Sequence, residues 1–144
     1  MELPKDLIVT KDYLDTHPDV VFVYGDNLLR KGLGGAARLR NHPCTYGFIT
    51  KKSPNLDNKA YFTVSEYRPV FERELKLLIH HITNHPEYTF LISKIGSGLA
   101  NRYNIYAQVI EPELYKLERM ENVVLLFDLQ RHIPKDIPGW AKRY

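Results

Sequence analysis

Short apolar runs separated by polar or glycine-rich stretches dominate the hydrophobic pattern of this chain. The runs are rich in β-branched and aromatic residues and lack a strict alternation with polar residues, which is typical of strands buried on both faces. The predicted strands cover residues 7–10, 20–24, 46–50, 88–92 and 123–127. Because such runs need partners on both sides, the pattern favours a layered fold over an isolated sheet.

Helical patterns lie between these runs. Residues 11–16 predict a brief helical turn, residues 36–40 open a second helix, and residues 103–119 predict a third, which Pro112 divides or kinks. Ser65 is the expected N-cap of a long helix that ends near residue 85. Strands that alternate with helices predict an α/β fold with three layers, α/β/α, around a mixed and largely parallel sheet.

Length and composition favour one soluble domain. The chain has 144 residues, of which 44% are hydrophobic and 26% charged, with a formal net charge of +3. We expect a single domain over 1–144, with a core at about 7–127 and a tail at 128–144 packed on the surface. Cys44 is the only cysteine in the sequence, and no apolar run reaches the length of a membrane span. These features predict a cytoplasmic protein without a membrane partner.

The first glycine-rich segment follows the run at 20–24. Gly25-Asp26-Asn27 is expected to end that strand, and Gly32-Leu33-Gly34-Gly35-Ala36-Ala37 leads into a helix. Glycine amides approach a phosphate closely because no Cβ intervenes, and the amides of a helix start favour the same anion. The spacing matches neither the Walker pattern nor GxGxxG. The alternative is an ordinary flexible connection between a strand and a helix.

The second glycine-rich segment is Ile95-Gly96-Ser97-Gly98-Leu99-Ala100-Asn101. It also follows an apolar strand and precedes a helical pattern. Ligands of open α/β sheets bind beyond the carboxyl ends of strands, so both segments are expected at one edge. Together they predict a site for a pyrophosphate or a phosphate and ribose, with Ser97 as an extra donor.

Thr50-Lys51-Lys52 ends a third predicted strand. A lysine at this place neutralises phosphate charge, or acts as an acid or base if it is desolvated. The alternative is a pair of solvated surface lysines. Asp26 and Asn27 have two interpretations as well: they orient a ribose hydroxyl or an attacking water, or they serve the turn in which they lie.

In this order the segments resemble a macrodomain, in particular the branch of the terminal ADP-ribose protein glycohydrolases and of the antitoxins that remove ADP-ribose from DNA. The resemblance rests on 32–37, on Phe48-Ile49-Thr50-Lys51 and on Ile95-Gly96-Ser97-Gly98-Leu99, and it extends from about residue 20 to residue 127. The chain also resembles uncharacterised phage and bacterial macro-like proteins.

The resemblance implies an ADP-ribose cleft, with the first segment near the distal ribose and the second on the phosphates. Lys51 matches the lysine that attacks or positions the ribose C1″ in this branch. Where the branch has an aspartate after Gly-Leu, this chain has Ala100. Asp26, Asn27 and Asn101 are therefore the candidate partners of Lys51. Neither a cofactor nor a metal is implied.

Several other residues suggest chemistry but have a simpler interpretation. His81 and His85 lie one helical turn apart, yet no acidic partner completes a metal site, so we expect solvated helix residues. Arg38 and Arg40 are expected on a solvated helix face. Tyr61 or Phe62 either stacks on an adenine or packs in the core.

Three functions fit these observations. The first is an enzyme that removes ADP-ribose from protein, DNA or a small NAD-derived metabolite. The second is a module that binds ADP-ribose without turnover, which Ala100 favours. The third is a binder of nucleic acid or of another nucleotide through the same cleft.

Overall fold

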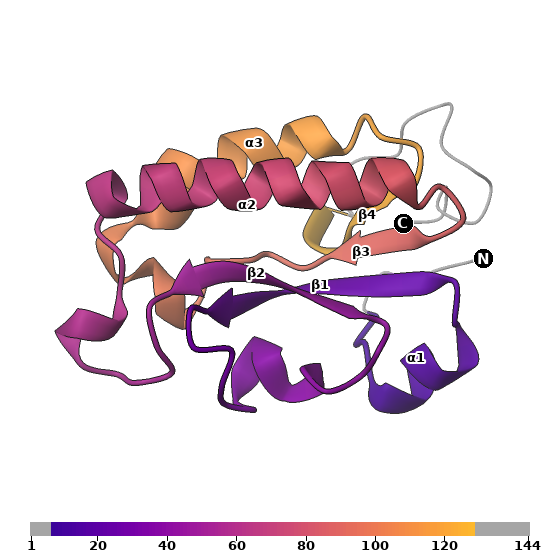
Figure 1. Cartoon of the computed structure of the whole chain (residues 1–144), viewed down its shortest axis with the longest axis horizontal. Coiled ribbons are helices and arrows are strands. Elements are labelled where there is room, and N and C mark those ends of the chain that lie inside the picture. The colour runs from indigo at the N-terminus through magenta and orange to yellow at the C-terminus, as the bar shows by residue number, and fades with distance from the viewer. Residues whose placement is uncertain (1–6, 129–144) are drawn as a thin grey trace.

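The structure, a computed structural model, describes residues 7–128. Its four strands form one sheet in the order β2-β1-β3-β4, and every neighbouring pair is parallel (Figure 1). The strands are β1 (Val20–Asn27), β2 (Thr45–Lys51), β3 (Thr89–Ile92) and β4 (Val123–Leu125). The predicted α/β class is confirmed. Within the described residues the sheet is wholly parallel rather than mixed.

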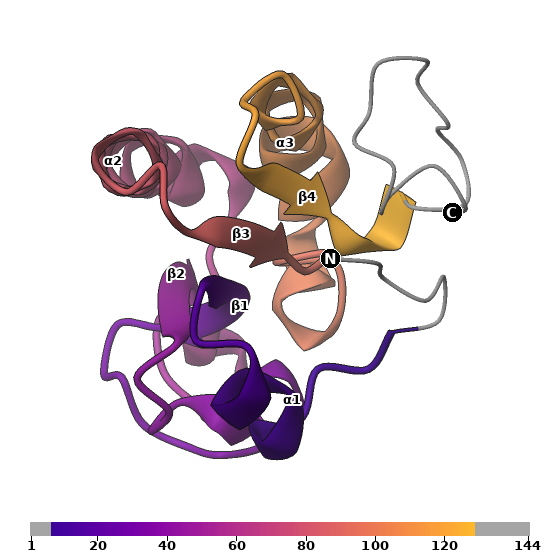
Figure 2. The same ribbon diagram turned by 90° about the vertical axis from the view of Figure 1, so that its right-hand side faces the viewer.

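Helices cover both faces of this sheet (Figure 2). The helices α2 (Val64–Asn84) and α3 (Glu111–Leu117) lie on one face, and α1 (Lys11–Thr16) and the 3-10 segment Gly35–Leu39 lie on the other. A large apolar core, which includes Phe48 and Phe90, packs under α2 and α3. A smaller one, which includes Leu14 and Phe22, lies on the opposite face. Burial on both faces explains the uninterrupted apolar runs.

The prediction of a strand at 7–10 is wrong. Residues 7–10 have no strand partner, and Thr10 is instead the N-cap of α1, where its hydroxyl accepts a hydrogen bond of 3.0 Å from the Tyr13 amide. Val9 is nevertheless buried, and its carbonyl accepts a hydrogen bond from Arg38. An apolar residue that packs on the core, as Val9 does, can give a short segment the same sequence pattern as a strand.

The N-cap of the long helix α2 lies two residues before the predicted one. Thr63, not Ser65, is the N-cap, and it forms a capping box in which the Glu66 carboxylate accepts a hydrogen bond of 3.0 Å from the Thr63 amide. That backbone hydrogen bond is the main cause that lowers the pKa of Glu66 to about 2, followed by the one from Lys52. The capping box fixes the start of α2 over the sheet.

The predicted helix at 103–119 is not continuous. Residues Leu99–Tyr103 form a 3-10 segment that ends at Asn104 with a φ of 62°, and a π-helical turn at Tyr106–Ile110 leads into α3. The left-handed Asn104 breaks the helical path, which a helical pattern in the sequence does not reveal. Pro112 lies in the first turn of α3, where proline is tolerated.

No helix within residues 7–128 combines the length and the apolar character that crossing a membrane requires. The expected tail at 128–144 lies outside the described residues beyond Asp128.

Candidate functional site

A cleft of about 610 Å³ opens at the carboxyl ends of β1, β2 and β3. Both glycine segments line it: the first glycine loop (residues 28–35) and the second glycine loop (residues 95–100) lie against the same hollow. The residues expected at the site from the sequence and found in its lining are Gly25, Asp26, Asn27, Gly32, Gly34, Gly35, Lys51, Gly96, Ser97, Gly98, Leu99 and Ala100.

One expected ligand-binding residue, Asn101, is not among the described lining residues. It serves the local fold, since its side-chain carbonyl accepts a hydrogen bond of 2.9 Å from the Tyr106 amide. Ala36 belongs to the 3-10 segment Gly35–Leu39. The lining also includes residues that the sequence did not single out as site residues, among them Lys31, Ser93 and Lys94.

Strand β1 continues through Gly25-Asp26-Asn27, contrary to the expected break. A register shift between Asp26 and Asn27 marks a bulge opposite the end of β2. A Cβ on Gly25 would lie 3.1 Å from the Thr50 hydroxyl and 3.7 Å from the Gly96 amide nitrogen. The tight contact is the one with Thr50, so the absence of a side chain at Gly25 leaves room for the Thr50 side chain of β2.

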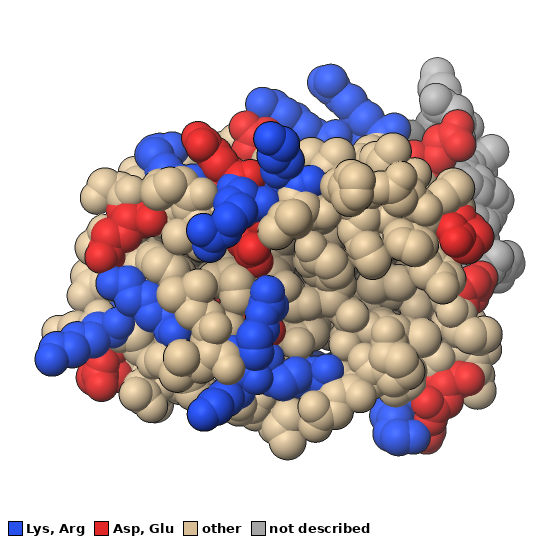
Figure 3. Space-filling model, in the orientation of Figure 1, with Lys and Arg blue, Asp and Glu red and all other residues tan. Residues whose placement is uncertain are grey.

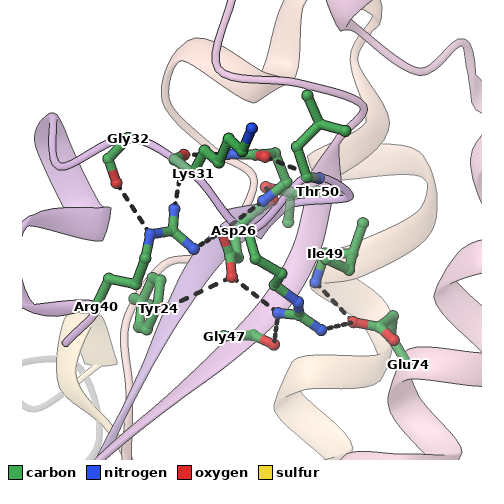
Figure 4. A network of polar contacts seen from close by, with 12 residues as sticks. Tyr24, Asp26, Lys31, Gly32, Arg40, Gly47, Ile49, Thr50 and Glu74 are labelled. Atoms are coloured by element: carbon green, nitrogen blue, oxygen red, sulfur yellow. Dashed lines mark hydrogen bonds and ion pairs between the residues drawn. The ribbon is translucent and has the colours of Figure 1, made fainter. Parts of the chain in front are cut away.

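Asp26 is the most buried charge of the site, with a side chain that is 1% exposed. Its carboxylate pairs with two arginines, with Arg30 at 2.8 Å and Arg40 at 2.5 Å (Figure 4). The Asn27 amide donates a further hydrogen bond to it. With both oxygens engaged, the carboxylate acts as an anchor for two arginines, which is a different task from orienting a ribose or a water.

Arg40 holds the first glycine loop from behind. Its guanidinium donates hydrogen bonds of 3.0 Å to the Gly32 carbonyl and 2.9 Å to the Lys31 carbonyl, while it pairs with Asp26 (Figure 4). The side chain is 11% exposed. The expected solvated position of Arg40 is thus wrong, because a 3-10 segment rather than a regular helix turns it toward β1. Arg38 is exposed, but it reaches back to the Val9 carbonyl.

The Asn27 side chain stabilises the turn in which it lies. Its side-chain carbonyl accepts a hydrogen bond of 3.0 Å from the Leu29 amide, and its side-chain amide donates one of 2.8 Å to the Lys31 carbonyl. Both polar groups of the side chain are thereby used within the loop.

Lys51 lies at the end of β2, between the two glycine loops. Its ammonium donates a hydrogen bond of 2.9 Å to the Asn55 carbonyl and lies 4.7 Å from the centre of the Tyr61 ring. Partial burial lowers the pKa of Lys51. Tyr61 is buried beneath this lysine, which agrees with core packing rather than with a free stacking surface.

The charges that line the cleft are mainly positive. Lys31, Lys51 and Lys94 contribute three ammonium groups, and Asp26, already paired with two arginines, is the one acid among the described lining residues. Lys and Arg side chains also project from the end of the molecule at which β1 and β2 end, on the left in Figure 3. This balance favours an anionic ligand.

The second glycine loop is held by packing. Gly96 is buried and has a φ of 78°, and a Cβ at this position would collide with the Ile110 side chain. The Ser97 hydroxyl is also engaged, since it donates a hydrogen bond of 2.6 Å to the Lys94 carbonyl. An L-residue other than glycine fits neither the backbone conformation nor the space at position 96.

Both loops lead into short 3-10 segments, Gly35–Leu39 and Leu99–Tyr103, instead of the expected helices. Segments of five residues have little aligned dipole. Attraction for an anion at this cleft therefore depends on individual amides and on lysines, rather than on a helix dipole.

The histidines of α2 form an aromatic cluster. The His81 ring lies 5.2 Å from Tyr46 and packs edge-on against Phe90. Burial, followed by the nearby His85 and His80, lowers the pKa of His81. No group of three or more His, Cys, Asp or Glu side chains arranged to hold a metal occurs in the part of the chain that the structure describes.

A second hollow of about 630 Å³ lies beside α1 and includes Cys44 in its lining. The Asp15 carboxylate in its lining lies 2.7 Å from both Lys11 and His42. The Cys44 amide donates a hydrogen bond of 3.0 Å to the other ring nitrogen of His42. Arg38 also lines this hollow and donates a hydrogen bond to the Val9 carbonyl.

Comparison with known proteins places the chain in a family. A family model described as "Family of unknown function (DUF7831)" matches residues 5–104. The chain belongs to this family. None of the curated proteins and none of the solved structures matches the chain. The DUF7831 match contains every lining residue of the cleft that the structure describes, because these extend from Gly25 to Ala100.

Proposed function

We propose that this protein binds ADP-ribose or a related nucleotide diphosphate in the cleft between the two glycine loops, on a macrodomain-like fold. The observation that carries the proposal is the convergence of both loops and three lysines on one hollow of about 610 Å³. Cavities of 300–1,000 Å³ are typical of small-molecule and cofactor sites. The parallel sheet with this cleft at its carboxyl ends supports the resemblance to macrodomains.

Binding without turnover agrees best with the contacts. Asp26 is committed to two arginines, Asn27 to its turn and Asn101 to the Tyr106 amide. Ala100, at the place where the resemblance puts an aspartate, lines the cleft with an apolar side chain. The candidate partners of Lys51 are thus all engaged elsewhere or unable to transfer a proton.

Removal of ADP-ribose from a modified protein, DNA or metabolite is the second candidate function. The feature that favours it is Lys51, which lines the cleft and has a lowered pKa, because a less protonated amine is a better base or nucleophile.

Calorimetry with ADP-ribose, followed by product analysis of the same sample with an ADP-ribosylated substrate, tests both candidates. We expect binding, and a reduction of affinity by about tenfold or more for Lys51→Ala because a charged contact is lost. Lys52→Ala is the matched control: Lys52 pairs with Glu66, is outside the cleft, and should change affinity by less than about twofold. Absence of binding would refute the proposal, and product formation would favour the enzyme.

A further inference from the structure

The direction of two carbonyl groups in the first glycine loop fixes the direction of the amides in the same peptide groups. Arg40 binds the carbonyls of Lys31 and Gly32, which belong to two successive peptide groups. No peptide bond in the described residues is cis, and in a trans peptide the N–H is directed opposite to the C=O. The amides of Gly32 and Leu33, which share these two peptide groups, therefore point away from Arg40.

These two amides have no partner within residues 7–128. Other amides of the same loop are used: Leu28 donates to the Lys51 carbonyl at 3.0 Å, Leu29 to the Asn27 side chain, and Arg30 to the Asn27 carbonyl. No hydrogen bond donated by the Gly32 or Leu33 amide occurs in that range.

The backbone at Gly32 brings the two amides to one side. Gly32 has a φ of 93°, and a Cβ here would lie 3.2 Å from Pro54. A left-handed residue within a loop aligns successive N–H groups into a concave anion site, known as a nest. Gly32 and Lys31 both line the cleft, and Leu33 follows Gly32 directly in the chain.

We propose that the amides of Gly32 and Leu33 form an anion subsite for one phosphate group of the ligand, and that Arg40 is the positioning residue that fixes it. This inference rests on the proposed function. Arg40 does not contact the phosphate. Asp26 holds the guanidinium, the guanidinium holds the two carbonyls, and the two amides remain directed outward.

Lysine does not replace Arg40 in this role. One planar guanidinium donates two directed hydrogen bonds to carbonyls and also forms an ion pair with the carboxylate, whereas an ammonium on a shorter span pairs with the carboxylate as a point charge. Arg40→Lys should therefore keep a positive charge beside Asp26 but lose the hydrogen bonds that hold the Lys31 and Gly32 carbonyls.

The test is a titration followed by amide NMR at pH 7, with inorganic pyrophosphate and with ADP-ribose as separate probes. In the unmodified protein we expect downfield shifts of the Gly32 and Leu33 amide protons with both probes. The Leu28 amide, which is already bonded, should shift little. Arg40→Lys should weaken pyrophosphate binding by about tenfold and reduce both shifts, because the two hydrogen bonds from the charged guanidinium to the loop carbonyls are lost.

Arg38→Lys is the matched control. Arg38 lies on the same 3-10 segment and binds the Val9 carbonyl, away from the loop, so its replacement should change affinity by less than about twofold. Thermal unfolding of both variants shows whether they remain folded, and the shifts in the unmodified protein test the subsite without any variant.

The outcomes separate this inference from the proposed function. If ADP-ribose binds and the Gly32 and Leu33 amides stay unshifted, or Arg40→Lys binds as tightly as Arg38→Lys, the subsite is refuted and the proposed function stands. If pyrophosphate shifts both amides and ADP-ribose does not bind, the subsite stands and the proposed function fails. If neither probe binds, both fail.

Discussion

The two glycine loops occupy equivalent places at strand ends but are held by different forces. The first loop is fixed by side chains, through Asp26 and the two carbonyl contacts of Arg40. The second is fixed by close packing, with the buried Gly96 pressed between Ile110 and Thr50. Both loops are rich in glycine, but the conformation of the first depends on charged side chains and that of the second on close packing.

This difference predicts which kind of change damages each loop. A packed glycine tolerates no added atom, because the interior is close to crystal density and has no room for a methyl group. A loop held by an ion pair tolerates added volume and instead depends on charge. Changing volume in one loop and charge in the other therefore tests the comparison.

The largest effect is expected for Gly96→Ala. A left-handed φ of 78° and a collision with Ile110 should together cost about 3 kcal/mol of unfolding free energy. Gly34→Ala in the first loop is the control: its φ of −84° and ψ of 153° are extended, and nothing lies within 4 Å of the added Cβ. Its change should stay within about 0.5 kcal/mol.

Urea unfolding of the two variants measures both changes. Equal stability of Gly96→Ala and Gly34→Ala would show that the second loop yields easily, and the distinction drawn between the loops would then be wrong.

Asp26→Asn should have the second-largest effect on unfolding. The variant keeps the shape of the side chain but leaves the nearly buried Arg40 without its counter-charge, at a cost of about 2 kcal/mol. The first loop should also open more often, which faster hydrogen exchange of the bonded Leu28 and Arg30 amides would report.

Asp15→Asn is the control for the Asp26 variant. Asp15 is also paired, with Lys11 and His42, but its side chain is 43% exposed. Solvent screens such pairs, so the change should be clearly smaller than for Asp26→Asn. A larger loss for Asp15→Asn would contradict the assigned importance of the buried carboxylate.

The sheet was largely predictable from the sequence because buried parallel strands form apolar runs. Four of the five predicted strands coincide with β1 to β4, within a few residues at their ends. The polar extension of β1 through Asp26 and Asn27 was not predictable, because turn-forming residues usually end a strand. The apolar residues before α1 led to the opposite error, a predicted strand that does not form, because Val9 is buried without joining a sheet.

The cleft was partly predictable as well. Two glycine segments that each follow a predicted strand were enough to expect that they face one hollow, and both do line the cleft. The support behind the first loop was not predictable. Arg38 and Arg40 look alike in the sequence, and only the winding of Gly35–Leu39 places one of them against Asp26.

The smallest expected effect concerns Lys51, which lies between the two loops and bears on ligand binding rather than on folding. Burial lowers the pKa of Lys51 from its ordinary value of 10.5, so the free protein loses this charge at a lower pH than an exposed lysine does. An anionic ligand prefers the charged form and raises the pKa when it binds. Affinity for ADP-ribose should therefore fall as the pH rises through the Lys51 pKa of the free protein, in a window that begins below 10.5.

Between pH 7 and pH 10 we expect the affinity to fall, measured by calorimetry at each pH. The diphosphate of ADP-ribose is a diester and keeps its charge across this range. Lys51→Arg is the control, because a guanidinium stays charged and should make the profile flatter. Two equally steep profiles would show that Lys51 does not contribute to anion binding. The ligand would then be bound by backbone amides of the two loops and by the other two lysines of the cleft.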